Sequence, residues 1–121
     1  MKIRSEYTCP LELIHDLIKG KWKPIILWQL RLGNTSPSNL EKDIQGITQK
    51  MLLEQLKELM EFEFVGKKVY DGYPLRVEYF LTENKGKQIL KAVKIMQEFG
   101  KDFMLEKGMQ DMLKKKGVIL E

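Results

Sequence analysis

The sequence has one cysteine, Cys9, and one histidine, His15, among its 121 residues. A single cysteine excludes a disulfide within the chain and a zinc site made of several thiolates, and a single histidine leaves too few nitrogen ligands for an ordinary metal centre. A glycine-rich phosphate loop, a nucleophile-elbow serine and an HExxH metal motif are also missing. We therefore expect no enzyme activity, no metal and no cofactor.

Long apolar runs are missing too. No run approaches the roughly 18 residues that a membrane-spanning helix needs, and the segment Met1–Thr8 lacks the apolar core of a signal peptide. Hydrophobic residues make up 43% and charged residues 31% of the chain, as in ordinary soluble domains. We expect one domain over residues 1–121, in the cytoplasm, with no membrane contact.

Apolar periodicity predicts four helices in the first half of the chain. They are expected over about 10–19, 22–32, 38–44 and 48–61. Gly20, Gly33 and Gly46 stand where the first three helices should end, and Thr48 is a suitable N-cap for the fourth.

A β-hairpin should follow these helices. Residues 64–70 and 76–81 are rich in β-branched and aromatic side chains, and the four residues Asp71–Pro74 between them have the composition of a turn. Thr82 should then cap a helix that runs to Phe99. Gly100 is expected to interrupt or bend that helix before a last amphipathic stretch over 101–116.

Helices followed by a hairpin, in this order, form the winged helix-turn-helix arrangement. The predicted fold class is α+β, mainly α, with a β-hairpin wing and C-terminal dimerisation helices. The DNA-binding core is expected over about 20–82, and dimerisation elements over about 9–19 and 83–116. Winged helices also occur as protein-binding modules, so the fold leaves open a protein–protein interaction module that does not bind DNA.

The helix expected over 48–61 has two different sides. At about 100° per residue, Leu52, Leu56 and Leu59 fall on one side, and a polar set at the N-terminal end falls opposite. In helix-turn-helix proteins that end reaches base edges in the major groove, where a lysine can donate to guanine and a glutamate can accept from cytosine. The expected DNA contacts of this helix are Thr48, Gln49, Lys50, Met51 and Glu54.

Other elements should touch the DNA backbone. These contacts are expected from Ser38, Asn39, Lys67, Lys68 and Arg76. The alternative for the helix is an ordinary solvated face, on which Glu54 pairs with Lys50 and with Lys57.

The charge distribution favours base contacts from the helix and phosphate contacts from other elements. The net charge is +4, but residues 34–64 hold three basic and six acidic residues, whereas residues 1–33 hold six basic and three acidic ones. Because the expected reading helix lies in the acidic segment, most neutralisation of phosphates should come from elsewhere. Candidates outside the hairpin are Lys19, Lys21 and Lys23.

The helix that follows the hairpin is apolar on two sectors. A surface helix normally needs only one apolar stripe, so the second favours packing against another chain. A twofold contact with the first helix would space two reading helices about one DNA turn apart. The alternative is a thicker monomer core closed by the C-terminal stretch. The expected interface residues are Leu11, Ile14, Ile89, Val93, Met96, Phe99 and Phe103.

Several motifs together resemble one family. The segments Cys9-Pro10, Gly20-Lys21-Trp22, Gly46–Leu52 and Val77–Thr82 resemble parts of the HxlR-type transcriptional regulators, and the resemblance covers about Cys9 to Phe103. It implies a homodimeric, sequence-specific regulator, most simply a repressor, that binds double-stranded DNA at a pseudo-palindromic operator. Pro37 and Glu63 depart from the family pattern, which commonly has an aromatic residue and a glycine there.

Cys9 has a further implied role. Some members of the family are thiol switches that respond to a small electrophile or oxidant through the cysteine that matches Cys9. A thiol at a helix N-terminus is favoured as the thiolate, and Arg4 and Lys2 lie close in sequence. The alternative is an inert, half-buried thiol at a helix start.

Overall fold

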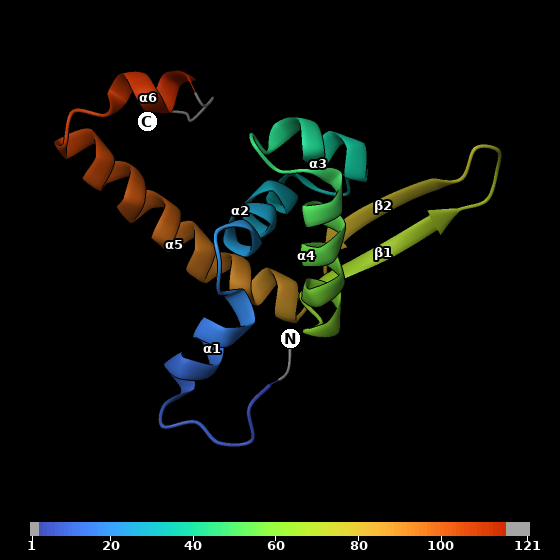
Figure 1. Ribbon diagram of the computed structural model, residues 1–121, viewed down its shortest axis with the longest axis horizontal. Coiled ribbons are helices and arrows are strands. Elements are labelled where there is room, and N and C mark those ends of the chain that lie inside the picture. The colour runs from blue at the N-terminus through green and yellow to red at the C-terminus, as the bar shows by residue number, and fades with distance from the viewer. Residues whose placement is uncertain (1–2, 116–121) are drawn as a thin grey trace.

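In the computed structural model, residues 3–115 are described, and they form six α-helices, one short 3₁₀ helix and a two-stranded hairpin. The elements are α1 (Pro10–Ile18), α2 (Trp22–Gln29), η1 (Leu30–Leu32), α3 (Pro37–Asp43), α4 (Gln49–Glu61), β1 (Val65–Tyr70), β2 (Arg76–Leu81), α5 (Lys85–Glu106) and α6 (Gln110–Lys115). Figure 1 shows the hairpin projecting to one side of the central helices and α5 leading to α6 on the other. The predicted winged helix-turn-helix fold is confirmed.

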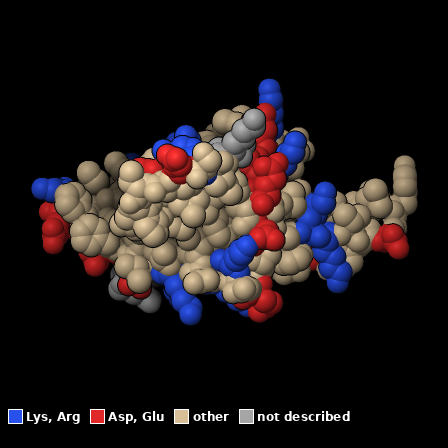
Figure 2. Space-filling view, turned by 90° about the horizontal axis from the view of Figure 1, so that it is seen from below, with Lys and Arg blue, Asp and Glu red and all other residues tan. Residues whose placement is uncertain are grey.

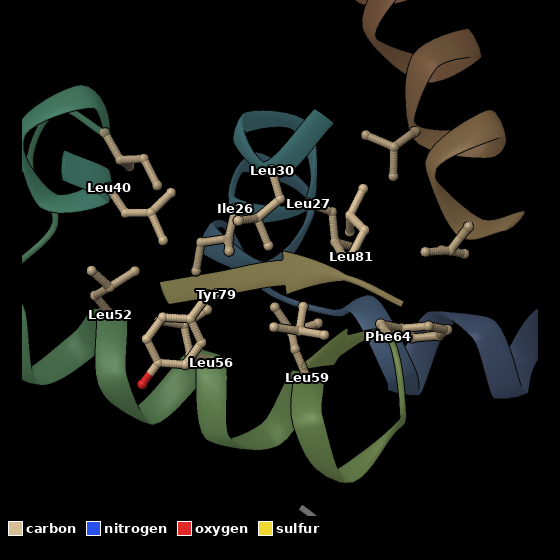
Figure 3. Packing of buried hydrophobic residues seen from close by; sticks show 14 of the residues in the cluster. Ile26, Leu27, Leu30, Leu40, Leu52, Leu56, Leu59, Phe64, Tyr79 and Leu81 are labelled. Atoms are coloured by element: carbon tan, nitrogen blue, oxygen red, sulfur yellow. The ribbon is translucent and has the colours of Figure 1, made fainter. Parts of the chain in front are cut away.

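The core fixes the orientation of α4. Leu52, Leu56 and Leu59 of α4 are completely buried, as are Ile26 and Leu27 of α2. Figure 3 shows that these side chains and those of β2 point toward a common centre. Burial of one leucine side chain contributes about 1.5–3 kcal/mol. Rotation of α4 about its axis would expose its buried leucines and lose this free energy for each of them.

The hairpin is joined to the core only at its base. Its antiparallel register runs from Val65 opposite Leu81 to Tyr70 opposite Arg76. Thr35 adds a bridge to Tyr79, with backbone hydrogen bonds of 2.8 and 3.0 Å, which anchors the start of α3 beside β2. The outer half of the hairpin therefore extends away from the core as a wing.

The expected interruption at Gly100 is wrong. Helix α5 is continuous from Lys85 to Glu106, about 33 Å at 1.5 Å per residue. The residues around Gly100 keep the helix continuous, because one glycine only weakens a helix and does not end it. The break comes later, at Gly108, whose φ of +75° suits glycine. Lys116, the end of the predicted last stretch, lies outside the described residues.

The other helix ends differ by a few residues. Helix α3 begins at Pro37, one residue before the predicted start, because Ser36 is its N-cap. Helix α5 begins at Lys85, although Thr82 still accepts a 2.7 Å hydrogen bond from the Gly86 amide. Within residues 3–115, none of the helices is long and apolar enough to cross a membrane.

Candidate DNA-binding surface

Thr48 positions the N-terminal end of α4. Its Oγ1 accepts a hydrogen bond from the Met51 amide at 3.2 Å, as predicted for an N-cap. Just before it, Gly46 has a φ of +91°, which favours glycine and turns the chain out of α3. The hydroxyl of Thr48 thus caps the helix. Thr48 is also exposed at the helix end, where a DNA contact would be made.

The first turns of α4 present polar side chains to solvent. Gln49, Lys50 and Glu54 are all exposed, opposite the buried leucines. Neither Lys50 with Glu54 nor Glu54 with Lys57 forms an ion pair within residues 3–115. These side chains therefore do not pair with one another, and they are accessible from outside the molecule.

Met51 is less accessible than the sequence suggested. We expected an exposed thioether on the polar side of the helix, but Met51 is half-buried and packs against the core. Packing against the core cluster covers a sector that helical periodicity alone assigns to solvent. A contact between Met51 and DNA is correspondingly restricted.

The start of α3 lies at the same end of the helix pair. Ser36 Oγ accepts from the Asn39 amide at 3.2 Å and lies 3.3 Å from Ser38 Oγ. Pro37 fits the first turn because a proline there loses no helical hydrogen bond. Ser38 and Asn39 are exposed. The N-cap itself was missed, although a serine before a proline is the kind of signal that marks one.

The cations of the wing lie on two different faces. Side chains alternate along a strand, so Lys67 shares a face with the core residue Tyr79, which it opposes. Lys68 and Arg76 lie on the other face, where both approach the ring of Tyr70 at 4.9 and 4.0 Å. All three cations are exposed.

Lys23 is not available to phosphate. It is only 3% exposed, and its Nζ donates to Gln55 at 2.8 Å and to Glu58 at 3.0 Å. The prediction that it neutralises DNA is therefore wrong, because its charge is used between α2 and α4. Lys19 and Lys21 are exposed, and Lys21 lies 4.5 Å from the ring of Trp22.

The surface charges follow the same division. Figure 2 shows basic side chains on the hairpin side and a group of acidic ones near the middle of the molecule, with side chains of both signs also at the opposite end. Helix α4 carries Glu54, Glu58 and Glu61 after its N-terminal turn. Helix α4 is therefore acidic after its first turn, and most of the exposed basic side chains lie on the wing and on other elements.

Cys9 is exposed at the N-cap position of α1. Its side chain makes no capping hydrogen bond. Arg4, which we expected to support a thiolate, is instead bound to Asp16 at 2.8 Å and to Glu12 at 3.3 Å. The hydrogen bond from Arg4 lowers the pKa of Asp16 below its usual value. Lys2 lies outside the described residues.

An apolar face is left uncovered on α1 and α5. Helix α1 has no fully buried residue, and its Leu11 is 76% exposed. On α5, Phe99 is 71% exposed and its ring lies 6.4 Å from that of Phe103. We use the name uncovered face for two groups of apolar side chains, one on each helix: Leu11 and the half-buried Ile14 on α1, and the exposed Ile95, Met96, Phe99 and Phe103 on α5.

Two residues of the predicted interface belong elsewhere. Ile89 and Val93 are 8% and 3% exposed because they pack in the core of their own chain. They cannot also contact a partner, so this part of the prediction is corrected. Ile95, which the interface prediction left out, is 69% exposed on the free side of α5.

Comparison with known proteins agrees with this architecture. Residues 17–108 match the HxlR-like helix-turn-helix family. The chain belongs to the HxlR family of transcriptional regulators. It is 40% identical over 97 residues to an HTH-type transcriptional regulator of Methanothermobacter thermautotrophicus. The aligned region covers 80% of this chain and 73% of that relative.

Solved structures of a redox regulator and of another transcriptional regulator are similar to this HxlR-family chain. The reduced form of the redox regulator HypR is 34% identical, with a TM-score of 0.73 over 88% of this chain and 99% of that one. The reduced form of the transcriptional regulator YodB from Bacillus subtilis is 34% identical, with a TM-score of 0.68 over 80% of this chain and 95% of that one.

Proposed function

We propose that this HxlR-family regulator is a cytoplasmic homodimeric repressor that binds a pseudo-palindromic operator in double-stranded DNA. In this function, the exposed N-terminal end of α4 reads base edges. The wing and the start of α3 hold the DNA backbone.

The observation that carries the proposal is the contrast between the two sides of α4. Its leucines are completely buried, whereas Gln49, Lys50 and Glu54 are exposed without ion pairs among the described residues. A rigid helix that presents donors and acceptors at its N-terminal end suits the major groove, because each base pair offers a distinct pattern of such groups there.

The uncovered face on α1 and α5 supports the homodimer. Large exposed apolar patches on a soluble protein mark interaction sites. A twofold arrangement lets one such patch cover its own copy. The two α4 helices would then address two half-sites on the same side of the DNA.

Cys9 is proposed as the point at which a small electrophile or oxidant acts. The support is its exposure at the start of α1, close in sequence to Leu11 of the uncovered face, and the similarity of the chain to the redox regulator HypR and to the reduced form of the transcriptional regulator YodB. Modification of the thiol would change the packing of α1 and so the spacing of the two reading helices. A Cys9→Ser variant that still loses DNA on treatment with diamide would contradict this role.

DNA binding is tested by titrating the protein into fluorescent duplexes over a range of salt concentrations. We expect affinity to fall steeply with salt, with a slope that reflects several phosphate contacts. Lys50→Ala should reduce the preference among sequences, whereas Lys68→Ala should weaken all sequences alike. Lys114→Ala, which removes one exposed charge at the far end of the molecule, is the matched control.

If the wild-type protein does not retain DNA at low salt, the proposal is wrong. The same holds if Lys50→Ala and Lys68→Ala both behave as Lys114→Ala does. A winged helix that only binds another protein would give one of these results.

A further inference from the structure

One face of the wing carries a small cluster that joins an aromatic ring, two cations and one acid. We name it the wing cluster and define it as Lys68, Tyr70, Arg76 and Glu78. The register places Lys68 opposite Glu78 and Tyr70 opposite Arg76 on the face that does not meet the core. The four side chains are therefore immediate neighbours on two adjacent strands.

Tyr70 is the centre of the wing cluster. The guanidinium carbon of Arg76 lies 4.0 Å from the centroid of its ring, and Lys68 Nζ lies 4.9 Å from it. The hydroxyl of Tyr70 donates to Glu78 Oε1 at 2.9 Å. One residue thus holds both cations by its ring and the acid by its hydroxyl.

The acid does not form an ion pair with either cation. Opposite charges that face each other across two strands normally attract, and Lys68 faces Glu78 directly. Yet no ion pair links Glu78 to Lys68 or Arg76 within residues 3–115. Tyr70 donates to Oε1 of the carboxylate instead.

A guanidinium held over a ring keeps its donors free. Its N–H groups lie in the plane of the group, so contact with a ring below leaves them directed outward. The guanidinium of Arg76 donates no hydrogen bond to any residue in 3–115 and contacts the ring of Tyr70 only. The side chain is therefore held in place before a ligand arrives, which reduces the entropy lost on binding.

We infer that Tyr70 is a positioning residue for DNA binding: it holds Lys68 and Arg76 ready for the phosphate backbone and keeps Glu78 from neutralising them. The inference rests on the proposed DNA binding and adds to it a residue that positions the cations of the wing. Tyr70 itself does not touch the DNA in this account.

The test is a double-mutant cycle on DNA affinity with random-sequence duplex DNA. Tyr70→Phe keeps the ring and frees Glu78, so affinity should fall roughly 3- to 10-fold and the salt slope should lose about one phosphate contact. Tyr73→Phe makes the same chemical change at the fully exposed wing tip and should have no effect. Glu78→Gln should restore affinity in the Tyr70→Phe background and change the wild type much less.

A merely structural role for Tyr70 predicts a different pattern. Glu78→Gln would then improve both backgrounds equally, through the loss of one negative charge, and that result overturns the inference. So does a Tyr70→Phe variant that binds DNA as Tyr73→Phe does. If the wild type does not bind DNA, both the proposed function and the inference are wrong. If the wild type binds DNA and Tyr70→Phe has no effect, only the inference is wrong.

Discussion

Lys23 on α2 donates a 3.0 Å hydrogen bond to Glu58 on α4, although Lys23 is almost completely buried. Gln55 accepts a second hydrogen bond from the same ammonium group. The contact ties the outer side of α4 to α2, while the leucines tie its inner side to the core. Helix α4 is therefore fixed on two sides, and Lys23, which the sequence suggested as a phosphate contact, holds α2 and α4 together instead.

Glu58→Ala should lower the free energy of unfolding by roughly 1–3 kcal/mol, because the buried ammonium of Lys23 would keep only one acceptor. Glu58→Gln, which retains an acceptor, should cost less. The hydrogen bond from Lys23 lowers the pKa of Glu58 below its usual value of 4.5. The stabilisation is therefore present above about pH 4.5 and is lost as the pH falls through the lowered value.

Urea unfolding at neutral and acidic pH measures both effects. Glu61→Ala, an exposed glutamate in the same helix, is the control. Equal losses for Glu58→Ala and Glu61→Ala, or a difference that does not shrink at acidic pH, would contradict the assigned role of the pair.

Glu63→Gly should raise stability by about 0.5–1 kcal/mol, because Glu63, just after the C-cap of α4, has a φ of +65°, a conformation that costs a residue with a side chain roughly 1–2 kcal/mol. Part of this gain is offset by the greater freedom of glycine in the unfolded chain. Glu63→Ala is the control, since it also loses the ion pair with Lys85 but keeps the backbone conformation. Urea midpoints that rank the alanine variant above the glycine variant would refute the explanation.

Gly86→Ala should destabilise the fold strongly, whereas Gly100→Ala in the same helix should not. A Cβ at Gly86 would lie 2.3 Å from the backbone oxygen of Phe64, which cannot move aside easily. A Cβ at Gly100 would meet nothing within 4 Å, and alanine is favoured over glycine in a helix by about 1 kcal/mol. Thermal unfolding of the two variants checks this contrast. Similar midpoints would show that the close approach at Gly86 does not make the fold sensitive to a side chain there.

Phe99→Glu should convert the proposed dimer to a monomer, because it places a charge in the uncovered face. Leu32→Glu is the matched control, since Leu32 is 74% exposed but lies outside that face. Sedimentation at several protein concentrations separates the outcomes. A wild-type protein that sediments as a monomer, or a dimeric Phe99→Glu variant, would rule out the interface.

The elements that depend on local signals were predictable. The leucine periodicity of α4 and the cap at Thr48 lie within a few residues of each other, and both are found in the structure. The hairpin was predictable for the same reason, because strand-forming residues flank a turn. The family was also recognisable from motifs, and the match over residues 17–108 confirms it.

Features that depend on which elements meet in space were not predictable. Periodicity showed two apolar sectors on α5, but only packing against α2 decides that Val93 is buried and Ile95 is free. Met51 is half-buried for a similar reason. The pairing of Lys23 with Glu58 joins residues 35 positions apart, and the two faces of the wing follow from its register.

Selection of bound sequences from a pool of random duplex DNA tests the central proposal most directly. We predict that the wild-type protein enriches a twofold-symmetric site with half-sites about one helical turn, or a multiple of it, apart. Lys50→Ala should enrich a site with relaxed preference at the position that this lysine reads. A wild-type protein that enriches no sequence at low salt, or enriches the same site as Lys50→Ala with equal preference, would contradict the account.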